Sequence, residues 1–273
     1  MHSFSSTQWA LSTPELLEMI LLQLDLRTLL ASAQRVCRAW NGLIQESSFI
    51  QEALFLKPIK KRDSNPIERT LNPLLSETFP AIFQQNETIF PRNKEEFTLT
   101  NLDMIKKPEK KAAYLRPEAS WRRMLIQQPP AFEIGIFRWW GNPFGYGFRY
   151  EIQQLKDAPR WHDGIRMERL FETLIFHSNL SPTFSPASIY WWGECSSPSI
   201  LRHLKEIGIT TVPDIILCTS SMVSCTDPDS DSEDDDRDVV DQIQAWYRNR
   251  GLQPKGLGDG WESTVHEKRG AWD

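Results

Sequence analysis

Cysteine and histidine side chains are the groups in this sequence best suited to ligate a metal ion. The candidates in one part of the chain are Cys195, His203, Cys218 and Cys225. Thiolate and imidazole are ligands that zinc prefers, but structural zinc sites usually include a close Cys-x-x-Cys pair, and this sequence has none. Buried or incidental thiols are the favoured interpretation. We therefore expect no metal and no other cofactor.

The sequence also contains no recognisable motif for covalent catalysis. Serine, cysteine and histidine residues are scattered without the glycine pattern of a nucleophile elbow. Gly141, Gly145 and Gly147 do not follow the strand-to-helix arrangement of a phosphate-binding loop. We expect a protein without catalytic residues.

An acidic run near the C-terminus accounts for the net charge of the chain. Residues 227–238 contain seven Asp, one Glu and one Arg, a net charge of -7, whereas the whole chain carries -5. The run lacks the glycine turn and final glutamate of an EF-hand loop, and it has too little apolar area to order itself. We expect residues 226–238 to be an acidic disordered loop. Ser230 and Ser232 are each followed three residues on by an acidic residue, which makes them candidates for phosphorylation.

Basic and apolar segments limit the expected partners and location. Residues 57–62 resemble a short nuclear-import patch, but basic clusters this small are more often solvated faces than nucleic-acid sites. No apolar run approaches the roughly 18 to 20 residues that span a bilayer, and residues 1–10 lack the pattern of a secretory signal. We expect no nucleic-acid or membrane partner, reduced cysteines, and a cytoplasmic and/or nuclear location.

Three short helices are expected within residues 13–46. Pro14 suits the first turn of a helix, because its backbone angle is preset and its missing N–H would have no partner there. Asp25 ends the first apolar run and can cap a second helix. The first helix has one broad apolar stripe, formed by Leu16, Leu17, Ile20, Leu21 and Leu24.

Beyond these helices the sequence predicts a mixed fold, so the whole chain is assigned to the α+β class. Residues 57–111 are expected to be a linker or surface wrap, because prolines disfavour helix at the residues before them. Residues 112–225 are expected to form an α+β domain, and residues 239–273 a short helix and a loose tail. The elements expected in residues 112–225 are helices over 117–128, 165–176 and 198–207 and strands over 134–140, 148–153, 188–192 and 209–218. The tryptophan pairs at 139–140 and 191–192 could line a recognition surface, but a place in the core is favoured.

The N-terminal helices carry a specific motif, and through it residues 1–56 resemble an F-box. The matching residues are Pro14-Glu15-Leu16-Leu17, Ile20-Leu21, Leu24, Asp25-Leu26, Val36-Cys37 and Trp40. Thr13 departs from the pattern, since the family usually has leucine before the proline. Residues 45–55, 72–75 and 122–125 also resemble, more weakly, segments of F-box proteins of filamentous fungi.

The resemblance implies binding to the Skp-type adaptor of a cullin-RING ubiquitin ligase. Three helices of about forty residues cannot bury all their apolar faces against one another, so some of that surface must meet a partner. The residues carried over as core or adaptor contact are Pro14, Leu17, Ile20, Leu21, Leu29, Val36, Cys37 and Trp40. Spacing alone does not separate the two roles.

The resulting hypothesis is a non-catalytic substrate receptor that holds the adaptor, and through it cullin, with its N-terminal helices. The α+β domain would hold a protein substrate that the sequence does not name. One alternative is an F-box protein that acts outside a ligase. A second alternative is an unrelated helical and α+β interaction protein or an enzyme without a recognisable motif.

Overall fold

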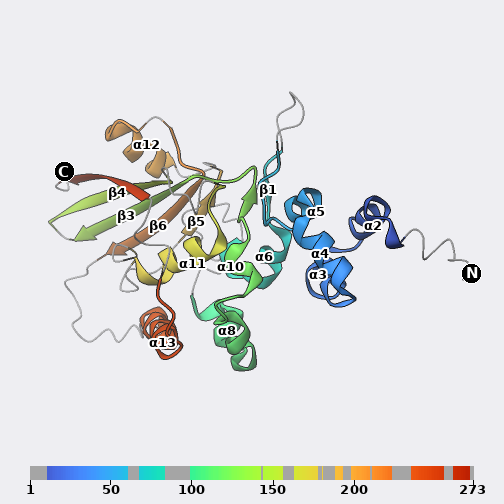
Figure 1. Cartoon of the computed structure of the whole chain (residues 1–273). Helices are drawn as coiled ribbons and strands as arrows, with labels where there is room; N and C mark the ends of the chain where they lie inside the picture. Colours follow the sequence, from blue (N-terminus) through green and yellow to red (C-terminus); the bar gives the residue numbers. More distant parts are fainter. Residues whose placement is uncertain are drawn as a thin grey trace, which may run out of the picture.

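The computed structural model describes the greater part of the chain in two connected regions. The described residues are 11–60, 68–83, 99–142, 144–155, 163–177, 180, 188–192, 198–209, 211–222, 235–254 and 261–270. We call residues 11–56 the N-terminal module and the described residues from 68 to 270 the sheet domain. The module lies at one end of the molecule and the sheet at the other (Figure 1).

The N-terminal module is helical, as the sequence predicted. Its elements are α2 (Pro14–Leu21), α3 (Leu26–Ala31), the 3-10 turn η1 (Ala33–Arg35), α4 (Arg38–Glu46) and α5 (Ser48–Ala53). Pro14 occupies the first turn of α2, and Asp25 caps α3 by accepting a hydrogen bond from the backbone N–H of Thr28 at 2.9 Å. Hydrogen bonds from the Thr28 side chain and backbone lower the pKa of the Asp25 carboxyl. Helix α5 was not expected from the sequence.

A small apolar core and one serine hold the module together. The buried core residues are Leu17, Leu21, Leu29, Ala33, Ile44, Ile50 and Leu54. The Ser47 hydroxyl donates to the Glu18 carboxylate on α2 and accepts from the backbone N–H of Ile50 at 3.1 Å, where it caps α5. One side chain therefore both starts α5 and joins it to α2.

A mixed five-stranded sheet dominates the sheet domain. In spatial order its strands are β5 (Ser188–Trp191), β6 (Ile215–Met222), β3 (Glu133–Asn142), β4 (Gly145–Leu155) and β7 (Trp261–Gly270). The β3–β6 pair is parallel and the other three pairs are antiparallel. The strands expected over 134–140, 148–153 and 188–192 are confirmed. The strand expected over 209–218 instead begins at Ile215, after Pro213, and runs to Met222.

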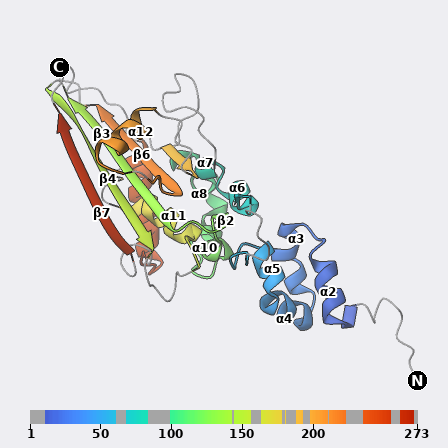
Figure 2. The ribbon, with the colours of Figure 1, turned by 90° about the horizontal axis from the view of Figure 1, so that it is seen from above.

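Helices cover the two faces of the sheet unequally. Ile134, Ile136 and Leu217 face α11 (Met167–Phe176) and α13 (Asp235–Asn249) in the larger core, whereas Phe137 and Phe148 face α12 (Pro198–Glu206) in the smaller one. Both views show α12 on the face opposite α11 and α13 (Figures 1 and 2). The helices expected over 165–176 and 198–207 are confirmed in α11 and α12. Trp191 is a core residue, while Trp139 and Trp192 are partly buried against the two cores.

Residues 57–111 differ from the expected linker or surface wrap. They contain β1 (Thr70–Leu71), α6 (Pro73–Thr78), α7 (Pro80–Phe83), η2 (Leu99–Asn101), α8 (Asp103–Lys106) and η3 (Pro108–Lys110), followed by α9 (Lys111–Tyr114). Leu75, Phe79 and Ile82 are fully buried in the larger core. The Asn72-Pro73 step that argued against helix in fact starts one: Asn72 is the extended N-cap and Pro73 the first helical residue.

Residues 117–128 form only a short helix, α10 (Ser120–Arg123), and the longer helix expected there is wrong. The chain then becomes extended, and Gln127–Gln128 form β2, which pairs with β1. The backbone N–H of Leu125 donates to Phe55 at 2.7 Å, and the backbone N–H of Asn72 donates to Ile126 at 2.9 Å. These tertiary hydrogen bonds replace the bonds that a continued helix would have made.

The C-terminal segment also differs from the expected loose tail. Residues 261–270 form β7 and pair with β4 along its length, from Tyr146 opposite Gly270 to Leu155 opposite Trp261. Helix α13 begins at Asp235, so residues 235–238 of the expected acidic loop belong to a helix. Ser230 and Ser232 lie outside the described residues.

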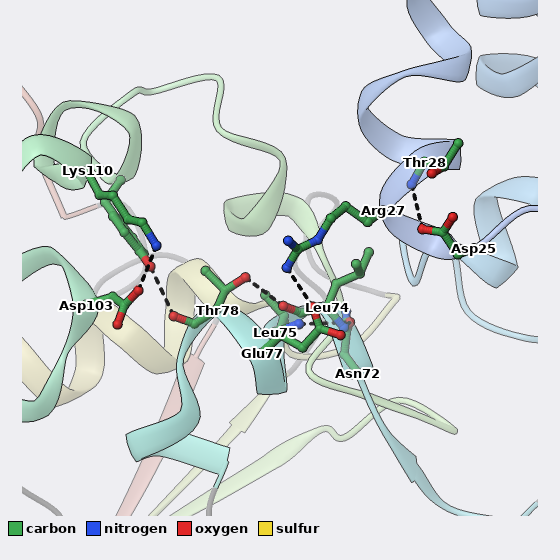
Figure 3. Close-up of polar contacts among 11 residues, drawn as sticks. Asp25, Arg27, Thr28, Asn72, Leu74, Leu75, Glu77, Thr78, Asp103 and Lys110 are labelled. Atoms are coloured by element: carbon green, nitrogen blue, oxygen red, sulfur yellow. Dashed lines mark hydrogen bonds and ion pairs between the residues drawn. The ribbon is translucent and has the colours of Figure 1, made fainter. Parts of the chain in front are cut away.

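Several hydrogen bonds and one ion pair fasten the module to the sheet domain. The Gln128 side-chain amide donates to the carbonyls of Glu52 at 2.9 Å and Lys57 at 3.0 Å. The Arg166 guanidinium donates to the Leu56 carbonyl at 3.3 Å. Arg27 on α3 pairs with Glu77 on α6 at 2.7 Å, beside the Asn72 cap (Figure 3). The module is therefore held against the domain on the α3 and α5 sides.

Candidate functional site

Helix α2 carries two adjacent apolar faces, and only one of them is buried within the chain. Leu17 and Leu21, four residues apart, are 3% and 0% exposed in the module core. Leu16, Met19 and Ile20, at the spacing of a second face, are 45%, 64% and 41% exposed. We call this second face the α2 outer face. Figure 1 shows α2 at the end of the module away from the sheet domain.

A second exposed apolar group lies where η1 leads into α4. Val36 is 60% exposed, and the Cys37 thiol is also exposed. Trp40, one turn into α4, is partly buried against the module core. Because α2 packs on α4, both exposed groups belong to the same small helical module.

The structure divides the eight residues predicted as core or adaptor contact. The buried core residues are Leu17, Leu21 and Leu29; Pro14, Ile20, Val36 and Cys37 are exposed; and Trp40 is intermediate. Residues of both groups have the same apolar character in the sequence, so only the packed structure separates them. The prediction that these residues contact an adaptor remains a prediction.

Sequence reasoning left four large exposed apolar residues of the module out of the candidate site, one of which is Leu11 at 38% exposed. Leu16 and Met19 share the α2 outer face with Ile20, and Phe49 on α5 is 49% exposed. The sequence does indicate that Leu16 and Met19 share a face with Ile20, because positions i, i+3 and i+4 of a helix lie on one face. Phe49 belongs to α5, which was not anticipated.

The chemistry available on the α2 outer face is apolar burial. Fully covering an aliphatic side chain contributes roughly 1.5–3 kcal/mol, so covering each of these half-exposed residues is worth about 1 kcal/mol. Contiguous exposed apolar side chains on a small domain are typical of protein–protein interfaces. The face is therefore suited to bind a partner protein.

Other candidate groups do not form a second site in the described part of the chain. His203 packs against Phe148 with ring centroids 4.6 Å apart, and Cys218 is buried in the smaller core. Cys195 and Cys225 lie outside the described residues. Within the described ranges, no group of three or more His, Cys, Asp or Glu side chains could hold a metal ion, and no helix is long and apolar enough to cross a membrane.

Comparison with known families identifies the module. A small helical bundle with an uncovered apolar face defines a protein-interaction module, and the F-box domain model matches residues 13–52. The chain therefore contains an F-box domain at residues 13–52, within its N-terminal module. The comparison with curated proteins and that with solved structures give no match.

The F-box assigns a general role to the N-terminal module. F-box domains bind Skp-type adaptors, and F-box proteins are generally non-catalytic adaptor subunits. The domain therefore supports a role in protein–protein interaction. The matched residues include the α2 outer face together with Val36 and Cys37.

Proposed function

We propose that this protein is a substrate receptor of a Skp-cullin-F-box ubiquitin ligase. The α2 outer face and the exposed Val36 and Cys37 bind the Skp-type adaptor, which connects the chain to cullin. The sheet domain binds a protein target for ubiquitination. The observation that carries the proposal is the exposed apolar face on a module matched by the F-box family.

The connection between the two regions supports this role. A receptor must hold its target in a defined position, because ubiquitin transfer by partner subunits depends on proximity and orientation. The Gln128 amide, the Arg166 guanidinium and the Leu125 N–H all bond to backbone carbonyls at the end of the module. Such bonds hold the domain in a fixed orientation relative to the adaptor face.

Retention of the adaptor in a pull-down tests the proposal. Met19→Asp and Ile20→Asp place a charge in the apolar interface without touching the module core, so they should weaken adaptor binding by about tenfold or more. Phe144→Asp is the matched control, since Phe144 is 84% exposed and lies in the sheet domain. Leu17→Asp is less informative, because Leu17 is a core residue and its replacement would unfold the module.

Two outcomes would count against the proposal. If the wild-type chain does not retain the adaptor, or if Met19→Asp and Ile20→Asp retain it as well as the control does, the assigned face is wrong. If the adaptor binds and cullin does not co-purify, the protein acts as an F-box protein outside a ligase. Under our proposal the complex occurs in the cytoplasm or nucleus, and fractionation of cells followed by adaptor co-precipitation measures where.

A further inference from the structure

The two edges of the five-stranded sheet differ in length. Strand β5 forms one edge with four residues, whereas β7 forms the other with ten. One side of β7 pairs with β4, and no strand in the described part of the chain pairs with its other side. Figure 2 shows β7 as the outer border of the sheet, on the side away from the N-terminal module. The sheet therefore has one long border strand.

Strand β7 lacks most of the features that keep a sheet edge from pairing with another chain. Natural edges are protected by short strands, prolines, bulges or charged side chains. β7 contains no proline, and its register with β4 runs without a skipped residue from Trp261 to Gly270, so it has no bulge. Every second residue of a strand paired on one side directs its backbone N–H and C=O groups to the other side. Of the usual protections, β7 has only its charged side chains.

Side chains on both faces of β7 are accessible to a partner. Those of residues 262–265 and 267–269 are exposed. Val265, near the middle of the strand, is apolar and 45% exposed. Thr264 and Val265 are β-branched residues, which favour strands because they pack well against a neighbouring strand. A strand added at this edge would therefore cover an apolar side chain and bond to the backbone at the same time.

A second copy of the chain presents an edge that can be compared with β7 residue by residue. Two identical strands pair antiparallel around a two-fold axis perpendicular to the sheet, and residues opposite one another then come from the same face. With the axis at Val265, this residue lies opposite its own copy, and Glu262 lies opposite Lys268 of the second copy. Symmetry makes this ion pair occur twice. The apolar side chain and the charges near the strand ends therefore both meet matching groups.

Other registers of the same strand pair are less favourable. An axis at Glu267 or Lys268 places identical charges directly opposite each other, which destabilises a sheet. An axis at Thr264 or His266 brings no two opposite charges of β7 across from each other. The charges of β7 thus select the register centred on Val265, and this self-complementarity favours a second copy over an unrelated extended segment.

Hydrogen bonds within each chain are compatible with this pairing. The Lys268 ammonium donates to Glu206 on α12 at 2.8 Å, and it has three N–H donors, so it can also bond to Glu262 of the second copy. On the other face Glu267 accepts two hydrogen bonds from Arg269, at 2.9 and 2.7 Å, so it needs no cation from the second copy. The pairing requires none of these bonds to break.

We propose that β7 of one chain pairs antiparallel with β7 of a second copy, around a two-fold axis at Val265, and joins the two sheets into one continuous sheet. The dimer goes beyond the proposed function and does not depend on it. Because the N-terminal module lies on the side of the sheet away from β7 (Figure 2), the two α2 outer faces lie at the outer ends of the dimer. A single strand pair is smaller than a standard protein interface, so we expect a dissociation constant in the micromolar range.

Sedimentation velocity of the full chain tests the proposal. Between about 1 and about 100 µM the wild-type chain should change from monomer to dimer. Glu262→Lys and Lys268→Glu each replace two attractive pairs of the dimer by two repulsive ones, so each should weaken dimerisation by about tenfold. Glu118→Lys and Lys60→Glu are the matched controls, because both residues are exposed and lie outside β7. The controls should dimerise as the wild type does.

A mixture of the two charge-reversal variants separates the effect of register from that of folding. Lys268→Glu also removes the bond to Glu206, so a loss of dimer in this variant alone could come from a disturbed β7. In an equimolar mixture of Glu262→Lys and Lys268→Glu, each lysine again lies opposite a glutamate. We expect the two variants to associate with each other about tenfold more tightly than either does with itself.

A cysteine at the two-fold axis provides a second, covalent test. Directly opposite residues of an antiparallel pair have Cα atoms about 4.5 or 5.5 Å apart, which a disulfide can span. Val265→Cys should therefore form a disulfide-linked dimer under mild oxidation, measured by non-reducing electrophoresis. Ser263→Cys is the matched control, because it lies on the same face but about 13 Å from its own copy across the axis. The wild type measures the contribution of the natural cysteines.

Four results would each overturn the proposal. The first is a wild-type chain that stays monomeric up to about 100 µM. The second is a loss of dimer in Glu262→Lys no larger than that in Glu118→Lys. The third is a mixture of the charge-reversal variants that does not associate although each keeps the wild-type melting temperature. The fourth is a yield of linked dimer from Val265→Cys no higher than that from Ser263→Cys. A failure of the wild-type chain to bind the adaptor would instead refute the proposed function alone.

Discussion

The N-terminal module and the sheet domain differ in how completely they bury their apolar side chains. In the sheet domain both faces of the sheet pack against helices, and the buried side chains of Arg169, Gln153 and Glu151 are hydrogen-bonded to one another. In the module, α2 buries Leu17 and Leu21 but leaves Leu16, Met19 and Ile20 largely uncovered. A small helical unit buries a smaller fraction of its surface than a larger domain does. The domain is thus stabilised from within, whereas the module has apolar surface left for a partner.

The largest expected effect comes from the buried ion pairs of the sheet domain. Arg122 is 2% exposed and pairs with Glu168 at 3.0 Å and with Glu172 at 3.6 Å, while donating to the Tyr247 hydroxyl at 3.2 Å. Arg122→Ala would leave two carboxylates buried without this cation and should lower the free energy of unfolding by about 4 kcal/mol. Chemical denaturation measures the loss. Arg123→Ala, at the exposed neighbouring position, should change it by less than about 0.5 kcal/mol.

Substitutions on helix α2 test whether its buried face and its outer face have different roles. The expected effect is of intermediate size. Leu21→Ala removes a fully buried side chain and should destabilise the module by about 3 kcal/mol. Met19→Ala, two residues away on the outer face, should cost less than about 0.5 kcal/mol yet weaken adaptor binding. Amide hydrogen exchange over residues 11–56 measures the first effect and adaptor pull-down the second. Equal destabilisation by both substitutions would contradict the division of α2 into two faces.

The smallest effect is expected at the joint between the two regions. Arg27 and Glu77 are 2.7 Å apart, but their side chains are 74% and 60% exposed. A double-mutant cycle with Arg27→Ala and Glu77→Ala should give a coupling below about 1 kcal/mol, and salt should screen it. A coupling above about 2 kcal/mol that persists in high salt would mean that this ion pair, more than the Gln128 bonds, fixes the joint.

The sequence predicted elements whose signals are local. Pro14 and Asp25 mark helix starts through their own backbone preferences, and the F-box pattern located the binding module. The strands expected over 134–140 and 148–153 correspond to β3 and β4, which the structure pairs with each other. Elements that depend on distant partners were missed. Residues 117–128 were expected to be one helix, but the hydrogen bonds of Leu125 to Phe55 and of Asn72 to Ile126 hold the end of this segment extended.

The sequence predicted which residues belong to the candidate site but not which of them are exposed. Ile20 and Leu21 are adjacent, similar in character and equally required by the F-box pattern, yet one is 41% exposed and the other fully buried. Their roles depend on where α4 and α5 pack, which periodicity does not specify. The juxtaposition of Arg138 and Arg149 was missed for the same reason. Arg138 and Arg149 become neighbours only through the register of β3 and β4.

The position of β7 has a consequence for how the chain matures on the ribosome. Strand β4 ends at Leu155, but its partner β7 begins only at Trp261, after β5, α12, β6 and α13 have been synthesised. Until β7 emerges, β4 presents an unpaired edge that another chain could join, a recognised route to aggregation. The charged side chains of β7, among them Glu267, Lys268 and Arg269, then become the new border of the sheet. Charged side chains on an edge strand discourage unselective pairing with other molecules. When β7 pairs with β4, the unpaired edge of β4 is therefore covered by a strand that is less prone to aggregate.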